Sequence, residues 1–294
     1  MNNIYTKKFH LFFCLLLLCF MGDSQIIYAA SDTPSILDRR IKIEKETRFK
    51  PFVLTPHKPN YIMPYTYNPQ PNQAPFAATS TNTFDNEEIK FQVSIKFPIA
   101  EKLFGEQGTL HFAYTNLSFW QAYNSSASSP FRETNHEPEI FLTIPNNWEI
   151  LGFKNKLNII GAVHQSNGRS EPLSRSWNRI YANFIFEQGN FYFSFKPWIR
   201  LGDRGKDDNP DIEHFMGHGE FRAAWATGKH TASIMLRNNF KSDNRGALEL
   251  NYSYPMSRRA KWFFQFFEGY GESLIDYNAH TKRIGIGIAF TDWL

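Results

Sequence analysis

The sequence predicts an all-β fold, a twelve-stranded antiparallel transmembrane β-barrel of the kind found in the bacterial outer membrane. Aromatic residues make up 17% of the 294 residues, yet the mean hydropathy is −0.44. After residue 30 no long apolar run occurs, and apolar and polar residues largely alternate. Strands with lipid-facing apolar side chains and a polar interior explain a chain that is rich in aromatic residues but polar on average.

Residues 1–30 have the pattern of a secretory signal peptide. Two lysines at 7–8 precede an apolar run at 11–21, and two alanines follow at 29–30. A membrane anchor is the alternative, but the run is shorter than the ~20 apolar residues that a spanning helix needs. We therefore expect this segment to be removed from the mature protein.

The positions of the cysteines and the net charge argue against a disulfide-stabilised protein and against a nucleic-acid-binding protein. Cys14 and Cys19 both lie in the predicted signal peptide, so we expect a mature chain without a disulfide. An acylated Cys19 is the alternative, but two leucines precede it where a lipidation motif would have small residues. The formal net charge of +4 is too small to indicate a nucleic-acid partner.

The rest of the chain is predicted to be a single domain, with a Pro-rich segment at 31–87 and the remainder of the barrel at 88–294. Most of the Pro-rich segment is expected to be a strap or loop, with one irregular strand over 52–67. From Ile89 onward, alternation predicts a strand with one apolar and one polar face. Ten further strands are predicted over 109–120, 139–147, 154–164, 174–186, 190–201, 215–227, 229–241, 245–254, 261–270 and 281–291.

The lengths of the connections predict the orientation of the barrel. Alternate connections are short at 188–189, 228 and 255–259, and long at 123–138, 202–214 and 268–279. Single-chain bacterial barrels have short periplasmic turns and longer external loops. This parity places Ser166 at the outer end of the fifth strand and Asn178 near the outer start of the sixth.

His164, Ser166 and Asn178 form a candidate catalytic group. Residues two apart on a strand point to one face, so His164 and Ser166 project together while Gln165 points away. A serine becomes a nucleophile when a base takes its proton, and a third group such as Asn178 orients the base. Gly168 offers a backbone N–H for an oxyanion. The alternative interpretation is a solvated loop edge.

Oxygen-bearing side chains gather in two loops on the same side of the predicted barrel. They are Ser170, Glu171 and Ser174 in the first loop, and Asp207, Asp208 and Asp211 in the second. Calcium prefers oxygen ligands of this kind, including backbone carbonyls. A polar surface loop without a metal is the alternative.

Four blocks of the sequence resemble the bacterial outer-membrane phospholipase A family. They are SSPFRETN at 128–135, SNGRS and SRSWNR within 166–179, DDNPDI at 207–212 and GYGESLIDYN at 269–278. The resemblance extends from near residue 60 to the C-terminus. Several matching blocks in the same order are more specific than any single triplet.

The resemblance implies a twelve-stranded barrel with a serine hydrolase site on its lipid-facing wall. It implies Ser166 as nucleophile, His164 as base and Asn178 as the residue that orients the histidine. It also implies a calcium ion that is held chiefly by the backbone carbonyls of Arg169 and Ser174 and by that of Ser128 of the partner subunit. This calcium ion and the Gly168 N–H would together stabilise the oxyanion. A possible second metal site uses Glu171 and Asp208. The monomer is expected to be dormant and the homodimer active.

The expected function is calcium-dependent hydrolysis of sn-1 and sn-2 acyl esters of glycerophospholipids and of lysophospholipids. A porin-like or degenerate barrel is one alternative, although all three residues of the candidate catalytic group are present. A lipid A-modifying barrel enzyme is another, although it would not be expected to carry the blocks at 128–135 and 269–278.

Overall fold

The computed structural model describes residues 35–47, 50, 53–77, 83–202 and 207–293. The predicted signal peptide lies outside the described residues. Within these ranges, no helix has the length and apolar character needed to cross a membrane.

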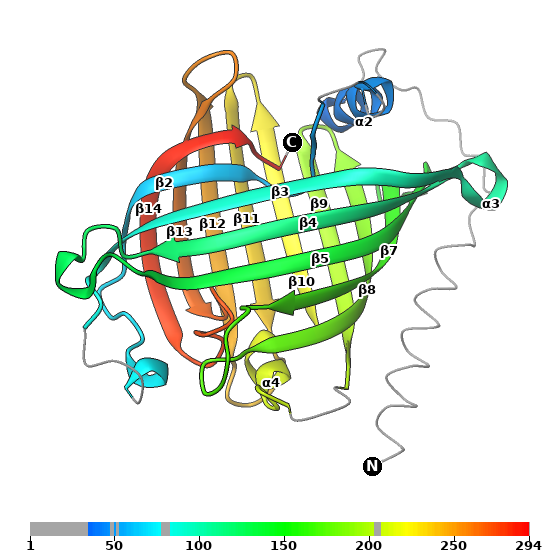
Figure 1. The fold of residues 1–294 in the computed structure, drawn as a ribbon. Coiled ribbons are helices and arrows are strands. Elements are labelled where there is room, and N and C mark those ends of the chain that lie inside the picture. The colour runs from blue at the N-terminus through cyan, green and yellow to red at the C-terminus, as the bar shows by residue number, and fades with distance from the viewer. Residues whose placement is uncertain (1–34, 48–49, 51–52, 78–82, 203–206, 294) are drawn as a thin grey trace.

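In the described part of the chain, twelve strands form a closed antiparallel barrel in which each strand pairs with its neighbours in the sequence. Figure 1 shows how these strands curve into a ring. The pairing of β14 with β2 closes the ring. The barrel strands are β2 Asn60–Tyr67, β3 Glu87–Lys102, β4 Gly108–Trp120, β5 Phe131–Pro145, β7 Phe153–Ser166, β8 Ser176–Gln188, β9 Phe191–Leu201, β10 Gly219–Thr227, β11 His230–Asn238, β12 Gly246–Pro255, β13 Lys261–Tyr270 and β14 His280–Thr291. The predicted fold class is confirmed.

Short elements decorate the barrel. Two two-residue strands extend it, with β1 Thr55–Pro56 on β3 and β6 Glu149–Ile150 on β7. The helices are α2 Ile36–Thr47, α3 Leu103–Glu106 and α4 Ile212–Met216, and the 3-10 turns are η1 Ala74–Phe76 and η2 Ser125–Ala127.

Three predicted boundaries were wrong. β5 begins at Phe131, eight residues before the predicted start, because Pro138 lies within the strand opposite Tyr114 instead of ending a loop. Residue 215 belongs to helix α4, so β10 begins later than predicted, at Gly219. The first barrel strand, predicted over 52–67, begins at Asn60. The Pro-rich segment, most of which was expected to be strap or loop, also contains α2.

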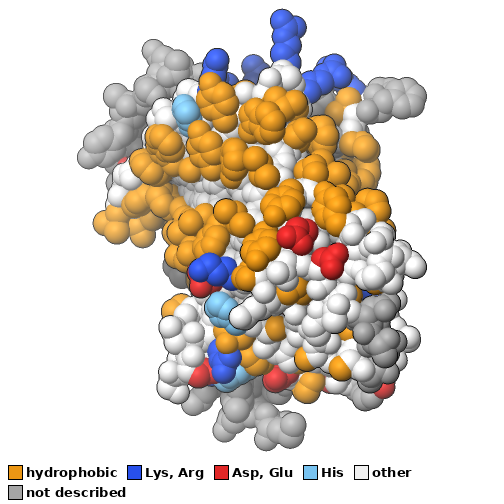
Figure 2. Space-filling model, turned by 90° about the vertical axis from the view of Figure 1, so that its left-hand side faces the viewer, with side chains coloured by type: hydrophobic (Ala, Val, Ile, Leu, Met, Phe, Trp, Pro, Cys, Tyr) orange, Lys and Arg blue, Asp and Glu red, His pale blue; other side chains and the backbone are white. Residues whose placement is uncertain are grey.

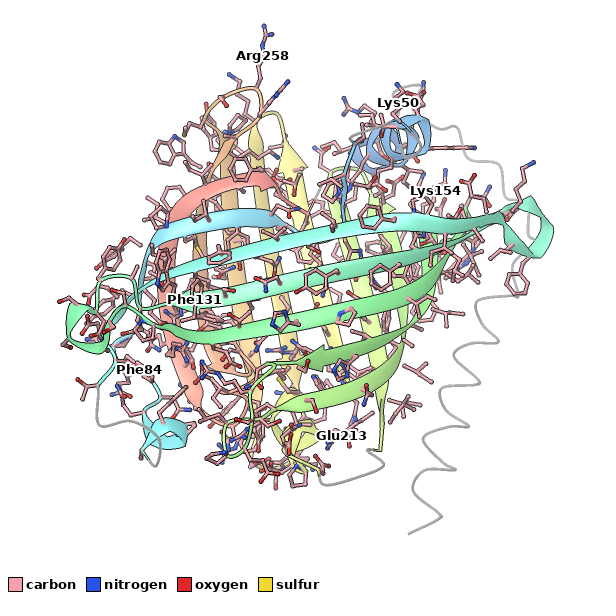
Figure 3. The ribbon with its side chains drawn as sticks, in the orientation of Figure 1. Lys50, Phe84, Phe131, Lys154, Glu213 and Arg258 are labelled. Carbon is pink, nitrogen blue, oxygen red and sulfur yellow. The ribbon has the colours of Figure 1, made fainter. Side chains whose placement is uncertain are left out.

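The two ends of the barrel differ as the turn lengths predicted. Figure 3 places Lys50 and Arg258 at the end that carries α2 and the β12–β13 turn, and Glu213 of α4 at the opposite end. The assignment of the α4 end to the cell exterior remains a prediction.

The outer wall of the barrel is apolar. On β14, Ile284 and Phe290 are each 60% exposed, whereas Arg283 on the opposite face of the strand is 2% exposed. Figure 2 shows hydrophobic side chains gathered over one band of the wall, with a more polar zone beneath it. This alternation is typical of a lipid-facing surface around a polar interior.

The interior holds a buried ion-pair network toward the α4 end. Its members are Glu88, Lys90, Arg132, Glu272, Asp276 and Arg283. Arg132 lies 2.7 Å from both the Glu88 and Asp276 carboxylates. Buried charges are tolerated only when they are paired in this way.

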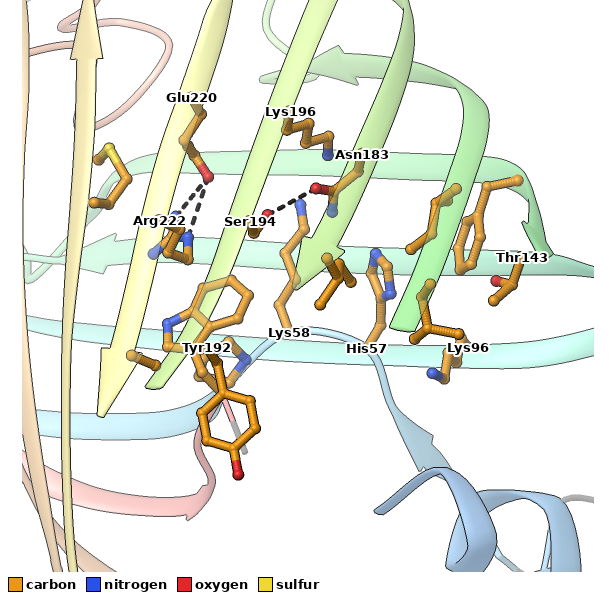
Figure 4. A pocket seen from close by; sticks show the side chains of 18 of the residues that line it. His57, Lys58, Lys96, Thr143, Asn183, Tyr192, Ser194, Lys196, Glu220 and Arg222 are labelled. Carbon is orange, nitrogen blue, oxygen red and sulfur yellow. Dashed lines mark hydrogen bonds and ion pairs between the residues drawn. The ribbon is translucent and has the colours of Figure 1, made fainter. Parts of the chain in front are cut away.

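Helix α2 lies across the other end of the barrel. Its Leu37 packs against Tyr192, and its Glu44 lies 2.7 Å from Lys96 Nζ. Beneath α2 is an interior cavity of about 650 Å³ that is lined by both polar and apolar side chains. Figure 4 shows charged and polar side chains within it, including the ion pair of Glu220 with Arg222 at 2.9 Å.

Candidate active site

β7 and β8 position the candidate catalytic group. In their antiparallel register His164 lies opposite Asn178, and the Nδ1 of His164 is 2.8 Å from Asn178 Oδ1. An amide oxygen only accepts hydrogen bonds, so Nδ1 carries the proton and donates it, which leaves the lone pair on Nε2. The asparagine therefore selects the tautomer in which Nε2 acts as a base.

Ser166 projects from the same face of β7 as His164, because side chains two apart on a strand share a face. His164 is exposed, while Ser166 and Asn178 are half-buried. Val163 and Trp177 are buried on the inner face of the same strand pair. The candidate catalytic group therefore lies on the outer wall of the barrel, where the resemblance leads us to expect it.

Gln165 points into the barrel and locks the two strands in register. Its Oε1 accepts hydrogen bonds from Trp177 Nε1 at 2.8 Å and from Arg179 Nη2 at 3.2 Å. The Arg179 guanidinium also lies 4.0 Å from the centre of a Trp177 ring. Because a slip of one residue would move every side chain to the opposite face, this inner clamp supports the alignment of His164 with Asn178.

Asn167 organises the loop that follows β7, and the sequence analysis missed it. Its Oδ1 accepts the backbone N–H groups of Arg169 at 3.3 Å and Arg175 at 3.0 Å. Its Nδ2 donates to the carbonyl of Leu173 at 2.8 Å. The Asn-Gly pair formed with Gly168, whose φ is +64°, is a turn signal that identifies such a residue.

Replacement of Asn167 by alanine is expected to lower kcat by about 10²-fold, because a displacement of about 1 Å in a catalytic group has an effect of this size. The variant would release the loop that carries Gly168 while retaining the candidate catalytic group. Steady-state hydrolysis of the substrate class that the resemblance implies measures the effect. The matched control is Asn146→Ala, since Asn146 caps backbone N–H groups in a turn at the other end of β7. Equal activity of both variants would contradict the assigned role.

The predicted calcium ligands lie in two connections. Arg169 and Ser174 belong to the loop between β7 and β8, and the Ser174 carbonyl accepts a hydrogen bond from Arg175 Nη1 at 2.6 Å. Ser174 Oγ donates to the carboxylate of Asp208. Ser128 follows η2 in the β4–β5 connection and has a left-handed backbone with φ of 61°.

The three acidic residues of the second loop each contact a different partner. Asp207 pairs with Arg200 at 2.6 Å, and Asp211 accepts a hydrogen bond from Tyr277 Oη at 2.6 Å. Burial and this hydrogen bond raise the pKa of Tyr277. The Asp208 carboxylate accepts a hydrogen bond from the Ser174 hydroxyl. Glu171, in the first loop, is exposed to solvent. Among the described residues no three His, Cys, Asp or Glu side chains are grouped to hold a metal.

The fold and the site together define a class of protein: a transmembrane β-barrel with a serine, histidine and asparagine grouped on its lipid-facing wall. The family model described as Phospholipase A1 matches residues 37–290. The chain therefore belongs to the phospholipase A1 family of enzymes, and it is a bacterial outer-membrane protein.

Individual relatives agree with this assignment. The Phospholipase A1 of Klebsiella pneumoniae is 37% identical over 284 residues, which cover 95% of this chain and 97% of the relative. The outer membrane phospholipase A from Escherichia coli superposes with a TM-score of 0.80 at 38% identity, covering 84% of this chain and 95% of that chain, as does its variant with an active-site asparagine replaced by alanine. The Salmonella typhi outer membrane phospholipase, a dimer with bound calcium, has a TM-score of 0.79 at 37% identity and covers 83% of this chain and 94% of its own.

Proposed function

We propose that this chain hydrolyses the sn-1 and sn-2 acyl esters of glycerophospholipids, and the remaining ester of lysophospholipids, with Ser166 as nucleophile, His164 as base and Asn178 as orienting residue. The observation that carries the proposal is the 2.8 Å contact between His164 and Asn178 on the lipid-facing wall, beside Ser166. An asparagine that belongs to the active site of the E. coli relative supports the role of Asn178.

The proposed reaction follows from this arrangement. His164 Nε2 takes the proton of Ser166 as its Oγ attacks the ester carbonyl, and the Gly168 N–H donates to the resulting oxyanion. The protonated imidazole then gives its proton to the glycerol oxygen, which leaves as the lysolipid. In the second half His164 takes a proton from water, the hydroxide attacks the acyl-serine, and the fatty acid departs as Ser166 recovers its proton. Asn178 carries no charge, and it stabilises the imidazolium by accepting the hydrogen bond from Nδ1 that holds the ring in place.

We propose that calcium binds in the loop after β7. The Asp208 carboxylate, which accepts a hydrogen bond from the Ser174 hydroxyl, places negative charge beside the Ser174 carbonyl. The carbonyls of Arg169 and Ser174 would hold the ion, with the carbonyl of Ser128 of the partner subunit, and Glu171 with Asp208 would form a possible second site. When bound, calcium supplies positive charge that favours a developing oxyanion.

Because one ligand comes from a second copy, the proposed active form is a homodimer and the monomer is dormant. The S. typhi relative, a dimer with bound calcium, supports this form. An enzyme surrounded by its own substrate class needs such control. Two incomplete sites that become complete only on association provide it.

Calcium removal is expected to lower hydrolysis by about 10²-fold, the size of effect seen when one oxyanion-stabilising group is lost. The mature protein, refolded in detergent, would be assayed on phosphatidylcholine with calcium, with magnesium and with a chelator. Magnesium should not replace calcium, because it requires near-ideal octahedral geometry and dehydrates reluctantly. Chemical cross-linking of the same samples should show more dimer with calcium. Full activity of a chelated, monomeric sample would contradict both parts of the proposal.

A further inference from the structure

A second histidine lies beside Ser166. In the pairing of β5 with β7, His136 is directly opposite Ser166. Directly opposed residues of an antiparallel pair have Cβ atoms about 4.5–5.5 Å apart and project from the same face. Because it projects from the same face as Ser166, the half-buried His136 shares the lipid-facing wall with the candidate catalytic group. The proposed reaction leaves it without a role.

Tyr114 forms a hydrogen bond with one ring nitrogen of His136. The Tyr114 hydroxyl is 2.7 Å from His136 Nδ1, and the two rings stack with centroids 6.2 Å apart. When the phenol donates to Nδ1, the proton of the neutral imidazole is on Nε2, which becomes a donor. This is the opposite tautomer to that of His164, whose Nδ1 donates to Asn178.

The Nε2 edge of the His136 ring lies beside Gly168, on the side toward which a Cβ of this residue would project. A Cβ added to Gly168 would lie 3.7 Å from both Cδ2 and Nε2 of His136, and no closer to any other neighbouring atom. Gly168 has a left-handed backbone with φ of +64° and is exposed, so substrate can approach it. A side-chain N–H and the proposed oxyanion donor thus lie next to each other, both beside the nucleophile.

We infer that His136 is a catalytic residue that donates its Nε2–H to the oxyanion alongside the Gly168 N–H, and that Tyr114 is the positioning residue that holds this tautomer. The inference rests on the proposed function, because the oxyanion forms when Ser166 attacks. Two converging donors stabilise developing charge in a water-poor site better than one. His136 transfers no proton, so the roles of His164 and Ser166 are unchanged.

The two substitutions of His136 are expected to differ. His136→Phe removes the donor and should lower kcat by about 10²- to 10³-fold, as loss of one oxyanion donor does. KM should stay within about twofold, because an interaction made only in the transition state does not contribute to substrate binding. His136→Gln retains an N–H of similar reach, and its kcat should exceed that of the Phe variant by at least about tenfold. Tyr114→Phe should lower kcat by less than His136→Phe does.

The chain offers a matched control in His230. Its Nδ1 is 2.7 Å from the hydroxyl of Tyr252, so it forms the same kind of His-Tyr pair, on β11 and β12. His230→Phe should leave kcat and KM unchanged. All variants would be refolded in detergent, checked by their heat-dependent mobility on gels, and assayed on a phosphatidylcholine with calcium, next to Ser166→Ala.

The outcomes separate this inference from the proposed function. A low kcat with unchanged KM in His136→Phe, with recovery in His136→Gln and no change in His230→Phe, supports it. A His136→Phe enzyme with normal kcat overturns it, as does a loss confined to KM or a Gln variant as slow as the Phe variant. If Ser166→Ala is fully active, the proposed function itself fails. If Ser166→Ala is inactive while His136→Phe is normal, only the oxyanion role of His136 fails.

Discussion

Replacement of Ser166 by alanine is expected to abolish ester hydrolysis, with a fall in kcat of at least about 10³-fold and on the order of 10⁶-fold if the enzyme behaves like other serine hydrolases. Without the Oγ there is no acyl-serine, and His164 has no hydroxyl to activate. The oxyanion donors remain and account for the residual rate. Release of fatty acid from phosphatidylcholine in detergent, with calcium present, measures the effect.

The matched control is Ser176→Ala. Ser176 lies directly opposite Ser166 in the pairing of β7 with β8, is half-buried like it, and carries the same hydroxyl on the same face. Of these two serines, only Ser166 shares strand β7 with His164, and the proposed reaction gives the Ser176 hydroxyl no role, so the control should retain activity within about threefold. Activity above about 1% in Ser166→Ala would reject the serine mechanism, since a lost nucleophile leaves far less than this.

Replacement of Arg132 by methionine is expected to destabilise the barrel by about 3–5 kcal/mol, the usual effect of removing one partner from a buried ion pair. Arg132 is 1% exposed and pairs at 2.7 Å with Glu88 on β3 and with Asp276 in the β13–β14 connection. Methionine fills much of the volume but leaves two buried carboxylates with one cation fewer. The midpoint of urea unfolding in lipid vesicles, followed by tryptophan fluorescence, should shift to lower urea concentration.

Arg258→Met serves as the control, since Arg258 is exposed in the β12–β13 turn at the other end of the barrel. Its midpoint should match that of the unmodified protein, because surface substitutions usually change stability by less than about 0.5 kcal/mol. Equal midpoints for Arg132→Met and Arg258→Met would refute a stabilising role for the interior network.

Alternation of side chains was sufficient to predict most of the barrel. The last strand, with Ile284 and Ile286 outward and Arg283 inward, repeats every two residues, and that period follows from the strand backbone itself. The same rule predicts that His164 and Ser166 share a face. It failed at β5, where Pro138 resembles the end of a loop but lies within a paired strand. Proline has no backbone N–H to donate to the β4 strand, but the residue pairs on either side of Pro138 keep β5 in the sheet.

Contacts between strands were beyond such reasoning. The sequence suggested that Asn178 was in reach of His164, but only the register of β7 with β8 brings them to 2.8 Å. The inner clamp from Gln165 to Trp177 and the loop contacts of Asn167 follow from the same register. No local pattern distinguishes Gln165 from other polar residues of the chain, and the Asn-Gly turn signal at Asn167 does not reveal which backbone groups its side chain binds.

What the sequence determined by itself is therefore the membrane barrel and its alternation of short and long connections, together with a candidate site of serine, histidine and asparagine. These depend on composition, on a period of two and on spacing along one segment. What only the tertiary structure decided is which side chains meet at Ser166, including His136, thirty positions earlier in the chain. Strand partners and register depend on the packing of the whole closed sheet, and so the second donor became visible only in the fold.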